Sequence, residues 1–344
     1  MKVFFVGIGY SVSIADEAVF YKIEDDKFTL VAAATDDFTI IADSSDSANF
    51  LIHEQLAKRF KVSDLLGPIN WLLDVSITRD LRKHTISLGQ QAYIEQILGR
   101  FDLGDAHKAT TLMETGIDLS LDSTHVSTAL SPIEKTKYWE MIGCLMYAAV
   151  MTRPDISFVV STLSCLHTFP ISRCTSHHSC SSCHLCLSLL IWHKRLQTCS
   201  WGSISSIVGY SDADWASQTH CHLISGFTFF IGDGVVSWSS KKQPIITLSS
   251  TEAKYVALTH TSKDIIWIHK LLTEFSFIFS FTSPTTLYCD NQGAVHLSKD
   301  PMFHGRMKHI DVHFHFIHQT VSQGHITLLY CPIPNRRHDC GHIH

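Results

Sequence analysis

The sequence predicts a mixed α/β (α+β) protein with two folded domains. Its 344 residues exceed the roughly 250 that a single hydrophobic core usually organises. Hydrophobic residues make up 45% of the chain and charged residues 17%, a composition that can bury a core and differs from that of disordered chains. Strand-like and helix-like patterns also follow each other along both halves of the chain.

The first elements surround a pair of acidic residues. The patterns of residues 28–34 and 38–42 indicate two strands, and Asp36 and Asp37 stand between them. A carboxylate pair in a strand, turn and strand arrangement is a candidate functional site. Residues 44–60 then carry apolar side chains near helical spacing and end in basic residues, which predicts an amphipathic helix.

Further elements complete the N-terminal half. Two short strands and a helix are predicted at 69–77, 84–88 and 90–101. Residues 104–130 are rich in Thr, Ser and Asp and have little periodicity, which indicates a long surface connection. Ser131 and Glu134 have the spacing of a capping box, with Pro132 at the first helical position. We therefore expect a helix that begins here and ends before Pro154.

The C-terminal half has an α/β order. Strands are predicted at 204–210, 226–231, 235–239, 287–289 and 326–330. Helices are predicted over about 251–275 and from about 291. Acidic residues follow several strand ends, where open sheets usually place their functional sites.

Charge, hydropathy and cysteine content limit the class of protein. The net charge of −5 offers no bulk attraction for a phosphate backbone, so nucleic-acid binding would need a local basic groove. No apolar run reaches the roughly 20 residues that span a bilayer, and no signal peptide is evident. We expect an intracellular protein, cytoplasmic or nuclear, with no membrane partner and with its eleven cysteines reduced.

Three acidic residues in the C-terminal half are candidates for metal-assisted chemistry. Asp212, Asp290 and Asp339 each lie just after a strand or within a predicted helix. Phosphodiester hydrolysis by two divalent ions needs several carboxylates that converge from separate elements. Without motif context, each of these residues is better explained as a solvated aspartate at a cap or turn.

The sequence around these acids resembles the ribonuclease H domain of copia-type retrotransposons. The matching strings occur in the family's order: Gly209-Tyr210-Ser211-Asp212-Ala213-Asp214-Trp215-Ala216, Ser237-Trp238-Ser239-Ser240-Lys241-Lys242-Gln243, Leu248-Ser249-Ser250-Thr251-Glu252-Ala253-Lys254-Tyr255 and Tyr288-Cys289-Asp290-Asn291-Gln292. The resemblance implies a ribonuclease H-like mixed sheet that acts on an RNA/DNA hybrid with Mg²⁺ or Mn²⁺. It makes Asp212 and Asp290 metal ligands and Asp339 the final acidic residue of the site.

One position departs from the family pattern. The family reads Ser-Ser-Thr-Glu-Ala-Glu-Tyr, and its second Glu, the expected metal ligand, is Lys254 here. Glu252 cannot simply replace it, because residues two apart lie about 200° apart around a helix. An ammonium group in place of a carboxylate removes an attraction for a cation and adds a repulsion. We therefore expect weak or absent cleavage, with Glu252 kept as the alternative catalytic residue.

The N-terminal half resembles the end of a copia reverse transcriptase, a palm and thumb remnant. Asp36-Asp37 stands in the place of the family's Tyr-Val-Asp-Asp turn, which implies a catalytic role for both residues. Further matches are Tyr93-Ile94-Glu95-Gln96-Ile97-Leu98, Ile142-Gly143-Cys144-Leu145-Met146-Tyr147-Ala148 and Thr152-Arg153-Pro154-Asp155-Ile156. The earlier palm aspartate and the fingers have no counterpart in the sequence, so we expect an incomplete polymerase.

The two resemblances are separated by a segment of different composition. No Asp or Glu occurs between Asp155 and Asp212, and this interval gathers Cys174, His177, His178, Cys180, Cys183, His184 and Cys186. A translated frameshift, an irregular loop and a zinc site are the three interpretations. We expect a reverse transcriptase part at 1–164, a disrupted segment at 165–202 and a ribonuclease H-like domain at 203–344.

Two hypotheses for function follow. In the first, the chain is an enzyme fragment with RNA-directed DNA polymerase and ribonuclease H ancestry that acts on RNA/DNA hybrids, with impaired or absent activity. In the second, it is a non-catalytic nucleic-acid-binding or interaction remnant.

Overall fold

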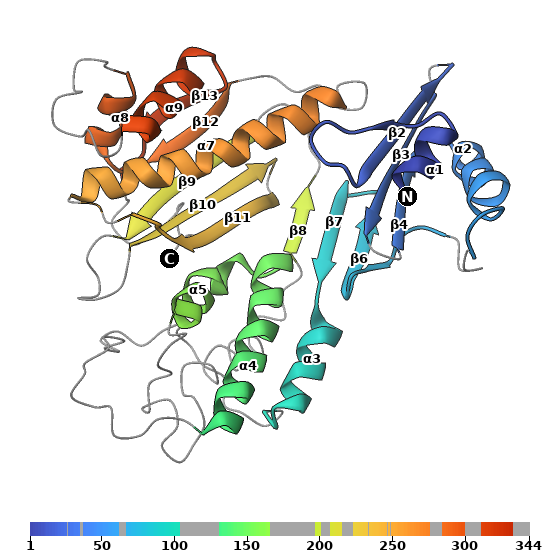
Figure 1. Ribbon diagram of the computed structural model, residues 1–344, viewed down its shortest axis with the longest axis horizontal. Helices are drawn as coiled ribbons and strands as arrows, with labels where there is room; N and C mark the ends of the chain where they lie inside the picture. The colour runs from blue at the N-terminus through green and yellow to red at the C-terminus, as the bar shows by residue number, and fades with distance from the viewer. Residues whose placement is uncertain are drawn as a thin grey trace. The chain divides into compact units, whose positions relative to one another are not determined.

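The computed structural model has two compact units and mixed helix and sheet content (Figure 1). The structure describes residues 1–25, 27–34, 37–61, 67–103, 131–165, 197–200, 207–214, 223–232, 234–245, 247, 249–275, 284–299 and 311–332. The first unit comprises 1–72 and 266–281, and the second comprises 73–265 and 282–344. No described helix is both long and apolar enough to cross a membrane.

The first unit is built on an antiparallel sheet in the order β1-β2-β3-β4. Its strands are β1 (Ser11–Val12), β2 (Val19–Glu24), β3 (Lys27–Ala34) and β4 (Asp37–Ala42), and β5 (Trp71–Leu72) lies at the end of its first segment. Its short helices are α1 (Lys2–Gly7), α2 (Ser45–Asn49) and the π-helix η1 (Phe50–Leu56). The core gathers Phe5, Tyr10, Phe20, Val31, Leu51 and Leu56.

The predicted helix over 44–60 is present but changes its type part-way. Ser44 caps α2, since its hydroxyl accepts a hydrogen bond from the Ser47 amide at 3.2 Å. The chain then continues as η1, in which Leu51 and Leu56 are both buried. Residues five apart lie on nearly the same face of a π-helix but well apart on an α-helix. The wider turn therefore places both leucines on the buried side of the helix.

The last turns of α7 (Ser250–Glu274) complete the first unit by binding the loop after β1. The Glu274 carboxylate accepts hydrogen bonds from the Ser13 hydroxyl at 2.7 Å and from the Ile14 amide at 3.0 Å. The Trp267 indole donates to the Ala15 carbonyl at 2.9 Å. These contacts join segments about 250–260 residues apart in sequence.

A helical layer opens the second unit. It consists of α3 (Gln91–Arg100), α4 (Pro132–Met151), the 3₁₀ helix η3 (Pro154–Ile156) and α5 (Ser157–Cys165). The predicted capping box is confirmed, since the Ser131 hydroxyl accepts from the Glu134 amide and the Glu134 carboxylate accepts from the Ser131 amide. A neighbouring antiparallel sheet holds β6 (Val75–Asp80), β7 (Thr85–Gly89) and β8 (Gln197–Ser200).

A five-stranded mixed sheet forms the rest of the second unit, in the order β11-β10-β9-β12-β13. Its strands are β9 (Ile207–Asp214), β10 (Ile224–Ile231), β11 (Gly234–Lys242), β12 (Thr285–Cys289) and β13 (Ile326–Tyr330). The first three are antiparallel, whereas β12 runs parallel to both β9 and β13. The first part of α7 runs across this sheet, and α8 (Gln292–Lys299) and α9 (Asp311–Ser322) lie beside β13 (Figure 1). This is the mixed, ribonuclease H-like sheet that the sequence predicts.

The helical layer and the mixed sheet belong to the same compact unit. The Trp238 indole of β11 donates a hydrogen bond to the Ala149 carbonyl of α4 at 2.7 Å. The domain boundaries at 164/165 and 202/203 stay predictions, because only Cys165 and Gln197–Ser200 are described between them. The cysteine and histidine cluster of that interval lies outside the described residues.

Candidate functional site

The register of two parallel strands brings Asp212 and Asp290 to one level of the mixed sheet. In the pairing of β9 with β12, Ser211 is the partner of Cys289. Asp212 follows Ser211 within β9, and Asp290 comes directly after the end of β12, so the two residues lie side by side across the paired strands. Their side chains are 25% and 15% exposed. The site is thus shielded but open to solvent on one side.

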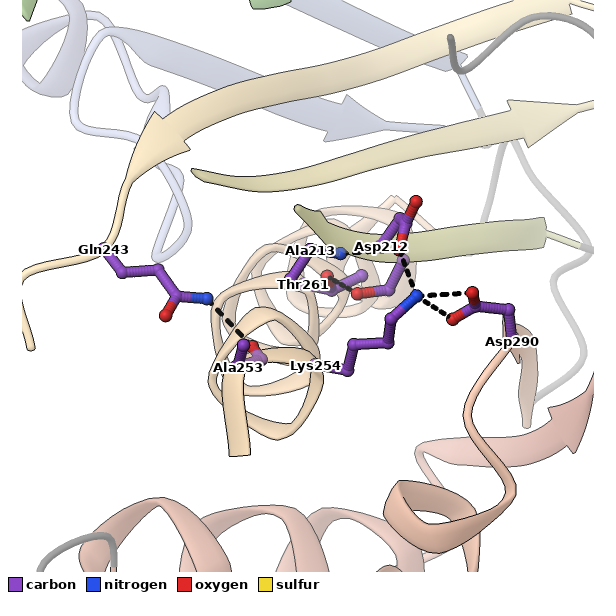
Figure 2. A network of polar contacts seen from close by, with 8 residues as sticks. Asp212, Ala213, Gln243, Ala253, Lys254, Thr261 and Asp290 are labelled. Atoms are coloured by element: carbon purple, nitrogen blue, oxygen red, sulfur yellow. Dashed lines mark hydrogen bonds and ion pairs between the residues drawn. The ribbon is translucent and has the colours of Figure 1, made fainter. Parts of the chain in front are cut away.

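Lys254 lies between the two carboxylates. Its ammonium group donates to Asp212 Oδ1 at 2.7 Å and contacts both carboxylate oxygens of Asp290 (Figure 2). Two oxygens bonded to one nitrogen at about 3 Å each are at most about 6 Å apart, so the acids converge as expected. Their role as metal ligands stays a prediction.

The carboxylates keep the lysine charged. Burial of the Lys254 side chain acts to lower its pKa, but hydrogen bonds and charge attraction from Asp212 and Asp290 outweigh burial and raise the pKa above its ordinary value. Lys254 is therefore a cation throughout the neutral pH range. Its single charge offsets one of the two negative charges beside it.

Glu252 lies on the same helix but in another direction. The Ser249 hydroxyl accepts a hydrogen bond from the Glu252 amide at 3.2 Å and so caps the start of α7. The Glu252 residue is 7% exposed. Since two residues separate by about 200° on a helix, Glu252 projects away from the face that carries Lys254. Its predicted catalytic role is untested.

The side chains present do not fit a divalent ion. Magnesium prefers a near-octahedral set of oxygen ligands, and manganese favours similar oxygen donors. At this site two carboxylates already share hydrogen bonds with an ammonium group. Within the described ranges, no cluster of three or more His, Cys, Asp or Glu side chains could hold a metal ion. Asp339, the third acid of the predicted set, lies outside the described residues.

The predicted polymerase pair is described only in part. The antiparallel register of β3 and β4 pairs Ala34 with Asp37, which leaves two residues between the strands. Asp37 is the first residue of β4 and is exposed, whereas Asp36 lies outside the described residues. Two antiparallel strands are confirmed here, but Asp37 belongs to the second strand and does not lie between the two. The catalytic role of Asp36 and Asp37 stays a prediction.

Three neutral side chains of the site were not singled out from the sequence. Thr261 of α7 donates to the Ser211 hydroxyl at 2.9 Å, next to Asp212 (Figure 2). The Gln243 amide nitrogen donates to the Ala253 carbonyl at 2.8 Å, next to Lys254. Only the position of Gln243 and Ser211 within the matching strings could have drawn attention to them.

Cys289 also lies beside the acids without having been predicted as a site residue. Burial raises the pKa of its thiol to about 11, with the Asp290 charge adding to the effect. The thiol is therefore protonated at neutral pH and unreactive as a nucleophile.

Comparison with known proteins places the chain in a family. No family model matches it. It is 33% identical over 280 residues to the retrovirus-related Pol polyprotein from transposon TNT 1-94 of Nicotiana tabacum, covering 80% of this chain and 20% of that protein. It is 32% identical over 334 residues to the Pol polyprotein from transposon RE1 of Arabidopsis thaliana, covering 96% of this chain and 22% of that protein. The chain belongs to the copia-type retrotransposon Pol polyproteins. It spans about a fifth of the length of these Pol relatives.

Solved structures with similar folds include two proteins bound to RNA/DNA hybrid. The foamy viral protease-reverse transcriptase in complex with RNA/DNA hybrid has a TM-score of 0.46 and 14% identity, over 90% of the Pol segment and 37% of the viral chain. LC11-RNase H1 in complex with RNA/DNA hybrid has a TM-score of 0.28 and 13% identity, over 37% of the segment and 86% of the enzyme. The family assignment rests on the sequence relatives.

Proposed function

We propose that this chain is the reverse transcriptase and ribonuclease H segment of a Pol polyprotein, and that its ribonuclease H-like domain binds RNA/DNA hybrid without efficient cleavage. The hybrid as ligand follows from the family resemblance of the strings around Asp212 and Asp290. The observation that carries the loss of cleavage is the contact of the Lys254 ammonium with both carboxylates.

The electrostatic argument rests on the position of the lysine nitrogen. Each pair of like unit charges about 4 Å apart repels by about 4 kcal/mol at an effective dielectric near 20. A divalent ion near Asp212 and Asp290 would meet this repulsion twice and would also have to displace the hydrogen bonds of Lys254. Hydrolysis that depends on two ions would lose both water activation and leaving-group stabilisation.

The role of the reverse transcriptase part is proposed from the family resemblance alone. Asp36 and Asp37 match the acidic turn of the family's reverse transcriptase, and we assign them the same role by resemblance. A polymerase also needs elements that belong to other parts of a Pol polyprotein. Polymerase activity is therefore proposed for the polyprotein, with this segment contributing the acidic turn and the helical layer.

Cleavage assays with a charge-reversed variant test the proposal. Lys254→Glu should raise Mg²⁺- or Mn²⁺-dependent cleavage of the RNA strand of a hybrid by at least about tenfold, because it restores the missing acid. Glu252→Gln is the matched control on the same helix and should change cleavage little. Efficient cleavage by the unmodified protein would contradict the proposal. If Glu252→Gln abolished cleavage, Glu252 would be the ligand.

A non-catalytic binding remnant is the second candidate, and the same lysine favours it. Under this hypothesis Lys254→Glu binds hybrid as the unmodified protein does but gains no cleavage with either metal. The cleavage assay on Lys254→Glu therefore separates the two candidates, and fluorescence anisotropy checks that the variant still binds hybrid.

A further inference from the structure

Gln243 is a buried polar residue that joins three elements beside the site. It follows β11 directly and is 1% exposed. Its backbone amide donates to the Leu223 carbonyl at 2.7 Å, which holds the end of β11 beside the start of β10. Its side-chain nitrogen donates to the Ser225 hydroxyl of β10 and to the Ala253 carbonyl of α7, both at 2.8 Å.

The orientation of the Gln243 amide follows from its partners. The Ala253 carbonyl can only accept a hydrogen bond, so the amide nitrogen must face it and the amide oxygen must face away. Within the described part of the chain, that oxygen is buried and has no hydrogen-bond partner. Leaving a buried acceptor unbonded is unfavourable, so the two donated bonds are what keep the side chain in this orientation.

Small side chains make this contact with the helix backbone possible. Ala253 and Ala257 of α7 are buried against Ala213 of β9, with Leu223 packed against them. Alanines let the helix approach the sheet closely, but they leave its rotation about its own axis weakly fixed. The bond from Gln243 to the Ala253 carbonyl supplies a directional restraint at the residue immediately before Lys254 (Figure 2).

From this geometry we infer that Gln243 is a positioning residue, which fixes the first turns of α7 through Ala253 and thereby aims the side chain at position 254 between Asp212 and Asp290. The inference deepens the proposed function, since it concerns the residue on which cleavage is proposed to depend. Among the described residues, the hydrogen bonds of Gln243 go to Leu223, Ser225 and Ala253 and to neither acid, so Gln243 acts through the helix backbone.

Acylation of lysines in the full chain tests the inference without metal or nucleic acid. An amine-reactive acetylating reagent is applied to the folded protein, and the modification rates of Lys254 and Lys263 are followed by peptide mass spectrometry. Lys263 lies on the same helix and is the internal reference. Gln243→Met keeps the length of the side chain and removes both donors. It should raise the rate at Lys254 relative to Lys263 by about fivefold, as expected for the loss of the hydrogen bond to Ala253, which is the one of the two that reaches α7.

A second variant and a control make the result decisive. Gln243→Asn keeps the amide but shortens it by one methylene, so it should also raise the Lys254 rate, and it serves if Gln243→Met does not fold. Thr228→Val is the control: it changes a different buried polar residue, in β10, and should leave the ratio of the Lys254 rate to the Lys263 rate unchanged. An unchanged ratio in the folded Gln243 variants, or an equal rise at both lysines, would overturn the inference. Because no hybrid is cleaved here, this result is independent of the proposed function.

Discussion

The two ends of α7 hold their neighbours by different physical means. Near the start, the Lys254 ammonium bonds two carboxylates, and the three side chains are 13%, 25% and 15% exposed. At the other end, the Glu274 carboxylate accepts hydrogen bonds from the hydroxyl and amide of one loop. At the start of α7, opposite charges compensate each other. At its end, a charged carboxylate accepts hydrogen bonds from neutral hydroxyl and amide donors.

This difference shows what each end requires of its residue. A carboxylate at the last turn of a helix is disfavoured by the helix dipole, so Glu274 depends on its loop partners for net stabilisation. Lys254 separates two groups that would otherwise repel each other. Removal of the charge is therefore expected to matter more at the start of α7 than at its end.

The largest expected effect is the removal of the Lys254 charge. Lys254→Met keeps an unbranched side chain but leaves Asp212 and Asp290 facing each other. We expect a loss of about 2–3 kcal/mol in the free energy of unfolding, below the 3–5 of a fully buried pair because all three side chains retain some exposure. Urea denaturation measures it. Lys242→Met, at an exposed lysine of β11, should change stability by less than about 0.5 kcal/mol.

The stability difference between the unmodified protein and Lys254→Met should depend on pH. The folded-state pKa of Lys254 is raised, so its stabilisation is fully present below the unfolded value of about 10.4 and is lost as pH rises through the folded value. The gap between the unmodified protein and Lys254→Met should stay constant at neutral pH and narrow above about pH 10.4. Urea midpoints across this range measure it, and narrowing already near pH 8 would show that the lysine is not held as a cation.

A smaller effect is expected at the other end of the helix. Glu274→Ala removes the acceptor of the Ser13 hydroxyl and the Ile14 amide, which should cost about 1–2 kcal/mol. Hydrogen exchange at the Ile14 amide should accelerate, and Glu274→Gln should show about half the effect. Glu17→Ala is the control, because the ion pair that Glu17 makes with Lys2 is exposed. Unchanged protection of the Ile14 amide in Glu274→Ala would show that the Glu274 carboxylate does not hold the loop.

The smallest effect is expected for Trp267→Phe. The change keeps an aromatic ring and removes the hydrogen bond from the indole nitrogen to the Ala15 carbonyl. Since the Trp267 residue is 45% exposed, the loss should be no more than about 0.5–1 kcal/mol. Urea denaturation and exchange in the loop after β1 check it. A loss equal to that of Glu274→Ala would mean that the indole contributes as much as the carboxylate to holding the loop.

Local signals predicted much of the fold. The capping box at Ser131 and Glu134 and the period of α7 are properties of neighbouring residues, and they were predicted correctly. The strand β8 was not predicted, because its extended form depends on pairing with β7, more than 100 residues earlier. The π-turns of η1 were also missed, since they follow from the packing of Leu51 and Leu56 in the core.

Some features of the candidate site were also predictable from the sequence, whereas others required the structure. The matching strings located Asp212, Asp290 and the departure at Lys254, and a helix alone explains why Glu252 points elsewhere. What the sequence could not provide was the reach of the Lys254 nitrogen to both acids, which depends on the distance between α7 and the ends of β9 and β12. Gln243 was missed because its role depends on a carbonyl of a distant element.

The parallel register of β9 and β12 also limits which sequences this fold accepts. Two acidic residues at one level of a sheet need a nearby positive charge, and a dissolved ion supplies it only where that ion is abundant. A lysine tethered at position 254 is always present, so Asp212 and Asp290 do not depend on a dissolved ion for a positive neighbour. A substitution at this position can therefore change the chemistry of the site while the fold persists.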